Sequence, residues 1–334
     1  MAPDRKAKTE GRVSLGVWAL GVLSMKLKVI FKLLKETFQE WQEDKASRLA
    51  AALAYYTVFS LTPLLILAIA IAGSIFGQEA ARGEIVGQIE GLVGTEGAKA
   101  IQTAIDNANQ PDVSSVASLI SVVVLLFSAS GVFAQLQDAL NTIWEVQPKP
   151  GVGVKGFIRK RLLSFSAVLG IGFLLMVSLI VSAILSGLSG YAQDLIPGTD
   201  WLWQILNLVI SFGVLTLLFA LIYRFLPDVK ISWNDVWIGA MITAVLFSIG
   251  KEALGLYLGR GSFGSTYGAA GSLVVILAWV YYSAQILFFG AEFTQVYARR
   301  YGSRIVPDKH AQSVPEATRA KQGMHRRQNS SSDR

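Results

Sequence analysis

The ionisable side chains with the greatest chemical interest in this sequence stand inside long apolar runs. Lys251 and Glu252 interrupt the run from Val236 to Leu258, and Glu292 lies near the end of the last run. A charge inside an apolar helix is costly, so such residues usually contact a substrate or ion, or pair with a neighbouring helix. Both alternatives stay open for Lys251 and Glu252, which we treat as candidate ligand-binding residues.

A polar stripe leads up to Glu292. Tyr281, Gln285, Phe288 and Glu292 follow one another at spacings of four, three and four residues, which places them on one helix face. This face predicts either a ligand cavity that Tyr281, Gln285 and Glu292 line, or hydrogen bonds that hold helices together. Glu292 has a further structural alternative, an ion pair with a residue such as Arg48.

A second stripe lies in the first apolar run and consists of Tyr56, Ser60 and Pro63. A proline lacks the backbone N–H, which leaves the carbonyl of Phe59 without its usual helical partner. We expect a broken helix beside a cavity, with these three residues as candidate ligand contacts. Hydrogen bonding between helices is the alternative for the tyrosine.

The segment over residues 259–271 has the sequence GRGSFGSTYGAAG. It contains too many glycines for a continuous helix and too few charges for an ordinary solvated loop. We expect it to re-enter the membrane, where its backbone amides and Arg260 form a candidate site for an anionic headgroup. A plain tight turn is the alternative.

The composition removes several other kinds of chemistry. The chain has 334 residues, 52% of them hydrophobic and 16% charged, and it contains no cysteine. Disulfides and cysteine-ligated metals are therefore excluded. The two histidines, His310 and His325, lie in a polar tail, so we expect no metal, no cofactor and no histidine-based catalysis. The formal charge is +7, and the basic residues lie beside apolar runs. This position favours lipid headgroups over nucleic acid as the partner.

Six apolar runs are long enough to cross a membrane, which takes roughly 20 helical residues. We predict an all-α polytopic membrane protein with six transmembrane helices in one bundle over residues 46–300, and an external loop over 78–115. The predicted spans are Leu49–Ile75, Val116–Phe133, Leu162–Leu188, Leu202–Phe225, Val236–Leu258 and Ala269–Val296.

The distribution of Lys and Arg sets the expected orientation, because basic flanking segments stay in the cytoplasm. Of the 30 Lys and Arg residues, only Arg82, Lys99 and Arg260 fall on the opposite side, and Lys251 lies within a span. Both the N-terminus and the C-terminus are therefore predicted to be cytoplasmic.

The two ends of the chain carry different patterns. Residues 1–45 form a segment in which Leu27, Ile30, Phe31, Leu34 and Phe38 alternate with lysines at helical spacing. This pattern predicts an amphipathic helix that lies on the inner leaflet, or one that packs against the end of the bundle. Residues 301–334 lack an apolar pattern and are predicted to be a disordered basic tail.

Four passages resemble the YihY/virulence factor BrkB family of bacterial inner-membrane proteins. They are Asp44–Pro63 (DKASRLAAALAYYTVFSLTP), Ala139–Trp144 (ALNTIW), Gly255–Gly259 (GLYLG) with Gly264–Ser272 (GSTYGAAGS), and Trp279–Glu292 (WVYYSAQILFFGAE). With the predicted spans, the resemblance covers roughly residues 38–300. It implies a protein of the bacterial inner membrane with a role in the cell envelope.

The resemblance also implies a function, since proteins of this family are proposed to move phospholipid or related lipids. Our leading hypothesis is a protein that binds or transports an anionic lipid, and the alternative is a scaffold for envelope protein partners or a homo-oligomer. Some members are labelled ribonuclease BN. The sequence argues against an enzyme, because it has neither a His/Cys ligand set nor a serine with an evident base.

Overall fold

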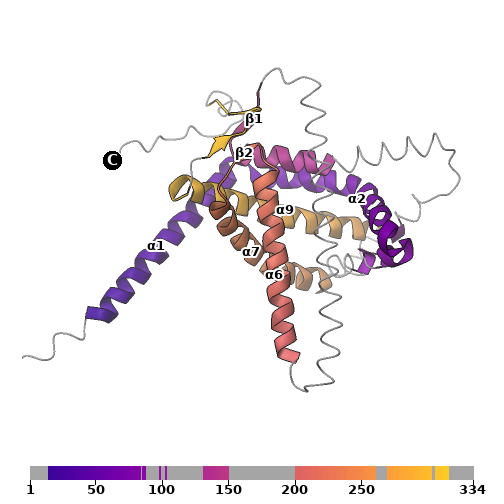
Figure 1. Cartoon of the computed structure of the whole chain (residues 1–334), viewed down its shortest axis with the longest axis horizontal. Coiled ribbons are helices and arrows are strands. Elements are labelled where there is room, and N and C mark those ends of the chain that lie inside the picture. Colours follow the sequence, from indigo (N-terminus) through magenta and orange to yellow (C-terminus); the bar gives the residue numbers. More distant parts are fainter. Residues whose placement is uncertain are drawn as a thin grey trace, which may run out of the picture.

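Helices make up most of the part of the chain that the computed structural model describes (Figure 1). That part comprises residues 14–83, 85–87, 98, 102–103, 131–149, 200–260, 269–302 and 305–315. Its long helices are α1 (Ser14–Glu43), α2 (Ala46–Phe76), a helix over 131–143, α6 (Asp200–Phe225), α7 (Trp233–Arg260) and α9 (Ala269–Arg300). Its strands are β1 (Val146–Pro148), β2 (Val229–Lys230), β3 (Val306–Pro307) and β4 (Ala311–Ser313).

Helices α2, α6, α7 and α9 lie where four of the spans were predicted, with bounds that agree to within about one turn. Among the described residues, three segments are long and apolar enough to cross a membrane: Leu208–Phe225, Trp233–Leu254 and Leu273–Arg300. The predicted span over 162–188 lies outside the described residues, and so does 116–133 except for its last positions, which begin the helix 131–143. The helical architecture is confirmed, and the six-span arrangement stays a prediction.

Helix α2 is continuous through Pro63, so the predicted break in this helix is wrong. A proline removes only one backbone donor, and membrane helices tolerate it where neighbouring helices support the chain. Support comes from α9, because Leu65 of α2 and Ile276 of α9 are buried together with Leu61 and Val280 packed against them.

Helices α7 and α9 approach closely at two reciprocal glycine–threonine contacts. Thr294 of α9 lies against Gly239 of α7, and Thr243 of α7 lies against Gly290 of α9, so closely that a Cβ atom on either glycine would overlap the threonine hydroxyl. Each threonine Oγ1 also lies within hydrogen-bond distance of the glycine carbonyl in its own helix, at 2.8 Å for Thr243 and 2.7 Å for Thr294. Small residues permit this approach, which gains dispersion energy where lipid supplies no hydrophobic driving force.

Tyr223 ties α6 to the same contact. Its side chain is fully buried, and its hydroxyl donates to the carbonyl of Leu287 at 2.8 Å. The hydroxyl also lies 2.9 Å from Thr243 Oγ1. Because Thr243 has one hydroxyl proton, it donates either to Tyr223 or to the Gly239 carbonyl. Three helices therefore meet around one small polar network.

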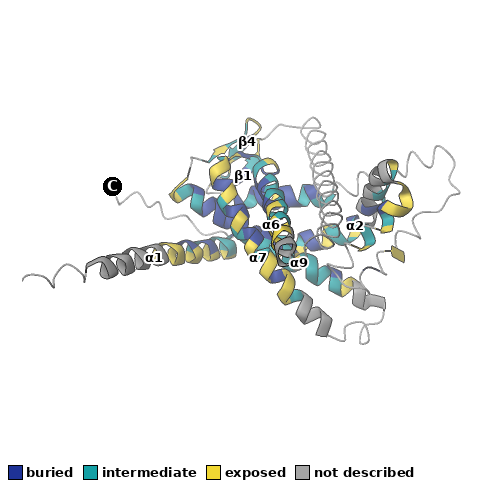
Figure 2. Ribbon diagram, turned by 60° about the horizontal axis from the view of Figure 1, so that its bottom comes forward, coloured by how far each residue is buried: buried dark blue, intermediate teal, exposed yellow. Residues whose placement is uncertain are grey.

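Helix ends from across the chain meet at one end of the bundle, which we call the capped end (residues 40–50, 137–149, 222–236, 292–302 and 305–315). The largest buried cluster joins the start of α2 (Ala46), the end of helix 131–143 (Ile143), the end of α6 (Leu226), the start of α7 (Val236) and α9 (Ala291). Buried residues concentrate towards this end in Figure 2, whereas α1 and α6 carry many exposed residues.

Two antiparallel strand pairs close the capped end, β1 with β4 and β2 with β3. The predicted disorder of the tail from residue 301 is therefore wrong for residues 305–315. That segment is held by backbone hydrogen bonds, with Val314 N donating to Glu145 O and Asp308 N to Asp228 O, each at 2.9 Å. Strands of two or three residues give no readable periodicity, which explains why the sequence did not indicate them. Residues 316–334 lie outside the described part.

Helix α1 is unbroken from Ser14 to Glu43 and projects away from the bundle at its N-terminal end (Figure 1). Near its C-terminal end, Leu33 is buried against Phe293 and Val296 of α9. Large exposed apolar residues on α1 are Val29, Ile30, Phe31, Leu34 and Phe38. Packing against the bundle end is thus present, while the position of α1 on a leaflet stays a prediction.

Replacing Gly290 with alanine should destabilise the protein by about 1–3 kcal/mol, because the added methyl group overlaps the hydroxyl oxygens of Thr243 and Tyr223. The control is Gly213→Ala in α6, where nothing lies within 4 Å of the added Cβ. The free energy of unfolding of both variants in lipid bicelles measures the difference. Equal stability of the two variants would contradict the close contact between α7 and α9.

Candidate functional site

The capped end brings together carboxyl groups from four separate segments. Glu292 comes from α9, Asp44 from the turn between α1 and α2, and Glu145 from the turn after helix 131–143. Asp44, Glu40 of α1 and Glu145 are all near enough to act electrostatically on Glu292. We call these four residues the acidic cluster.

Glu292 is the innermost member of the acidic cluster. Its exposed fraction is 0%, and both carboxyl oxygens are buried without a hydrogen-bond partner among the described residues. Gln295, three residues further along α9, is also buried with its Oε1 unpartnered. Buried polar atoms are nearly always hydrogen-bonded, so this pair calls for a functional explanation. The ion pair with Arg48 that was one alternative for Glu292 is not formed, and Arg48 is exposed.

Backbone geometry also marks this region. Lys45 and Glu145 are the non-glycine residues with positive φ in the described part of the chain, with φ values of 54° and 56°. Each follows the end of a helix, where the left-handed conformation is usually taken by glycine. A side chain in this conformation costs roughly 1 kcal/mol. The chain therefore accepts an energetic cost at Lys45, which follows Asp44, and at Glu145, which follows Trp144.

The nearest cation, Arg299, is already engaged. Its Nη2 donates to Glu36 Oε1 at 2.7 Å and to Glu40 Oε1 at 2.8 Å, and Arg300 forms a further ion pair with Glu36. These pairs fasten α1 to the end of α9. Their geometry leaves Glu292 without a direct cationic partner in the described structure.

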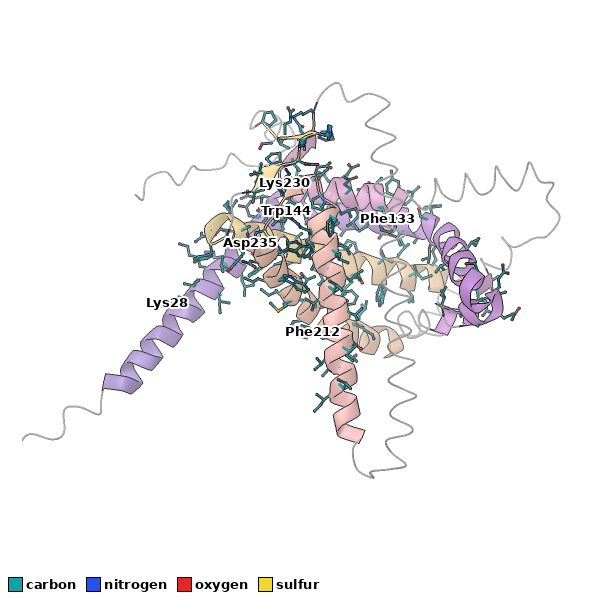
Figure 3. All side chains as sticks on the ribbon, in the orientation of Figure 1. Lys28, Phe133, Trp144, Phe212, Lys230 and Asp235 are labelled. Carbon is teal, nitrogen blue, oxygen red and sulfur yellow. The ribbon has the colours of Figure 1, made fainter. Side chains whose placement is uncertain are left out.

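Asp228 holds the neighbouring part of the capped end together. Its carboxylate accepts from Asn141 Nδ2 at 2.8 Å and from Gln137 Nε2 at 3.3 Å, and its backbone N–H donates to Asn141 Oδ1 at 2.8 Å. These bonds fix the α6–α7 connection to helix 131–143. Figure 3 labels Trp144 and Lys230 in this part of the molecule.

Lys251 lies elsewhere, on α7 towards its C-terminal end. It lines a shallow crevice between α7 and α9 that holds essentially no space for a water molecule (≈ 0 Å³); the other lining residues are Phe247, Leu254, Trp279, Tyr282, Ser283 and Ile286. The lining combines one cation and two hydroxyl groups with apolar and aromatic side chains. Lys251 and Glu252 are both exposed, and neither pairs with a neighbouring helix within the described residues.

The residues of the two predicted stripes differ in how far they are buried. Along α9, Tyr281 is exposed, Gln285 is partly buried and Glu292 is fully buried. On α2, Tyr56 is exposed and Ser60 is buried, and both lie beside Gly131 at the start of helix 131–143. These residues therefore occupy separate environments.

Two candidate residues have no described side-chain environment. Pro63 lies within α2 and Arg260 is the last residue of α7, and the glycine-rich segment after Arg260 lies mostly outside the described part. A second hollow of about 440 Å³ lies at residues 79–102 and is lined by Glu79, Arg82, Gly83, Val86 and Gln102. None of the predicted site residues lines it.

The described residues contain no group of three or more His, Asp or Glu side chains placed to hold a metal ion.

Comparison with known protein families gave a match over most of the chain. The model of the family described as virulence factor BrkB matches residues 37–315. The chain belongs to the virulence factor BrkB family. The match includes strands β3 and β4, which the sequence pattern alone assigned to a disordered tail.

Relatives of this BrkB family chain are named as membrane proteins. The UPF0761 membrane protein of Verminephrobacter eiseniae is 29% identical over 281 residues, which is 79% of this chain and 62% of the relative. That of Ralstonia nicotianae is 28% identical over 252 residues, or 75% of this chain and 55% of the relative. That of Alteromonas mediterranea is 28% identical over 258 residues, or 76% of this chain and 83% of the relative.

The chain therefore spans between about half and two thirds of the length of the first two relatives. No solved structure matches it. Together with the three apolar helices found among the described residues, these relatives identify the BrkB family chain as an integral membrane protein.

Sequence reasoning missed several residues that build the capped end. Asp44 and Asn141 stand in two of the family-like passages, yet no role was assigned to them. Asp228 and Arg299 lie near the ends of predicted spans, where the sequence pattern indicated only ordinary flanking charges. Their partners are about 90 residues away for Asp228 and about 260 for Arg299 in sequence, and no local pattern records such distant pairs.

Replacing Asn141 with alanine should lower the free energy of unfolding by about 1–3 kcal/mol, because it leaves the Asp228 backbone N–H and one carboxylate oxygen without their partners. Thr142→Ala is the matched control, since the Thr142 hydroxyl bonds only within its own helix. Denaturant titration of both variants tests this. A loss that is no larger for Asn141 than for Thr142 would show that the clamp on Asp228 contributes nothing.

Proposed function

We propose that this protein binds and transports a phospholipid or a related anionic lipid. In this proposal the headgroup contacts the crevice between α7 and α9, while the acyl chains remain in the bilayer. The observation that carries the proposal is the position of Lys251, a cation at the crevice that has no ion-pair partner among the described residues. An intramembrane cation without a protein partner is a functional candidate.

The chemistry of the crevice supports an amphiphilic ligand. Lys251 supplies positive charge, Tyr282 and Ser283 supply hydroxyl groups, and Phe247 and Leu254 supply apolar surface. The crevice holds essentially no space for a water molecule (≈ 0 Å³), so it is a surface crevice and not an enclosed ligand pocket, a class that begins at ~300 Å³. A lipid that remains mostly in the bilayer needs no enclosed pocket, so the small size agrees with this class of ligand.

The exposed surface of α6 also supports contact with lipid. Large apolar side chains point outward along its first half, and they are Ile205, Leu206, Leu208 and Val209. Such a surface is compatible with acyl chains and unfavourable in water. The crevice at Lys251 belongs to the same helical bundle, since α6 packs against α7.

We further propose that the capped end faces the cytoplasm of a bacterial inner membrane. Support comes from its basic residues, which include Arg48, Lys149, Lys230, Arg300 and Lys309. Basic residues flank the cytoplasmic ends of spans. Lys251 then lies towards the opposite, external leaflet.

The test of the lipid proposal is the amount of phospholipid that co-purifies with the protein, measured by mass spectrometry per mole of protein. Lys251→Ala should retain about fivefold less anionic phospholipid, because one lysine near an anionic headgroup contributes about 1 kcal/mol. Lys230→Ala, which removes an exposed lysine at the capped end, is the control and should retain the wild-type amount. Equal retention by both variants would contradict a lipid site at Lys251.

A further inference from the structure

We propose that the carboxyl group of Glu292 is a proton-binding site inside the capped end. The site consists of Glu292 and Gln295 on α9, faced by Asp44 and Glu145 from the other elements that meet there. No role in proton binding follows from lipid handling alone. The proposal rests on the geometry of the capped end.

Burial favours a bound proton on Glu292. Glu292 has an exposed fraction of 0%, and neither carboxyl oxygen has a hydrogen-bond partner in the described part of the chain. An ionised carboxylate in such surroundings loses its hydration and gains no compensating bond. Binding of a proton removes the charge and supplies a hydroxyl donor. The unpartnered Oε1 of Gln295, also buried, offers an acceptor in the same part of α9.

The charges around Glu292 also favour a bound proton. The charged residues that act on Glu292 are Glu40 from α1, Asp44 from the α1–α2 turn, Glu145 from the segment after helix 131–143, and Arg299 from α9 itself. Three of these four are acidic and repel a second negative charge. The single cation, Arg299, bonds to Glu36 and Glu40. The balance of nearby charge therefore favours a neutral Glu292.

A proton fits this position better than a metal ion does. A metal ion needs several donor groups arranged around it, and the described residues hold no such group of His, Asp or Glu. The hollows described in the structure lie at Lys251 and at Arg82, away from the acidic cluster. A proton needs neither a ligand shell nor a cavity, so it is the cation that fits this position.

The members of the acidic cluster also provide a path for proton exchange. Asp44 is 2% exposed and the Glu40 side chain is 13% exposed, whereas Glu292 is fully buried, so the other acidic groups are more accessible to water than Glu292 is. Chains of Asp and Glu residues serve as proton relays in membrane transporters. A link between this proton and lipid movement would rest on the proposed lipid function, whereas proton binding itself does not.

Infrared spectroscopy of the purified full chain in lipid at neutral pH tests the proposal. Exposed carboxyl groups ionise near pH values of about 4 and are charged under these conditions, so a carboxylic acid C=O band reports a buried protonated group. We expect this band in the wild type, its loss in Glu292→Gln, and its retention in Glu252→Gln. Glu252 is the control because it is an exposed carboxyl group of the same membrane bundle.

Three outcomes would overturn the proposal. The first is a wild-type spectrum without a carboxylic acid band, a result that does not depend on the folding of any variant. The second is a band that survives in Glu292→Gln. The third is a band that is lost in Asp44→Asn but not in Glu292→Gln, which would assign the proton to Asp44. Because none of these results involves lipid retention, a failure here is distinguishable from a failure of the proposed lipid function.

Discussion

The reciprocal contact of Gly239 with Thr294 and of Gly290 with Thr243 is the constraint on which the rest of this structure depends. Between apolar helices in lipid, association comes from close packing and from a few hydrogen bonds rather than from the hydrophobic effect. Each glycine admits the threonine of the opposite helix, and Tyr223 adds α6 through Thr243. Because α9 also packs against α1 and α2, the position of α9 relative to α7 fixes the position of every long helix that meets at the capped end.

The capped end follows from that arrangement and gives the protein its most unusual chemistry. Once α9 is fixed, Arg299 reaches Glu36 and Glu40 of α1, and the turn at Asp44 lies near Glu292. The strands and the clamp on Asp228 then close the end from the other side. Glu292 is buried among acidic groups at the capped end, whereas Lys251 is exposed beside Glu252 towards the other end of α7. We propose a proton as the ligand of the first site and an anionic lipid headgroup as the ligand of the second.

The sequence predicted the helices well because their apolar runs are long and have clear limits, as in α6, α7 and α9. It also selected Glu292 and Lys251, since a charge within an apolar run is a local signal. It did not predict that Glu292 is isolated from Arg48, or that Lys251 lies beside Tyr282 rather than Tyr281. These facts depend on how one helix is rotated against another, and that rotation is set by glycine contacts. In a sequence, a glycine such as Gly290 reads as a weak point of a helix, although here it is the point of closest packing.

The central claim is that α7 and α9 interlock through these glycine–threonine pairs, and a double-mutant cycle on Gly239 and Thr294 tests it most directly. The measured quantity is the free energy of unfolding in bicelles for Gly239→Ala, Thr294→Gly and the double variant. Removing the threonine side chain makes room for the alanine methyl group, so we predict that the double variant is more stable than the sum of the single effects allows, by about 1 kcal/mol or more. Additive effects, within about 0.5 kcal/mol, would show that these residues do not touch and would contradict the account.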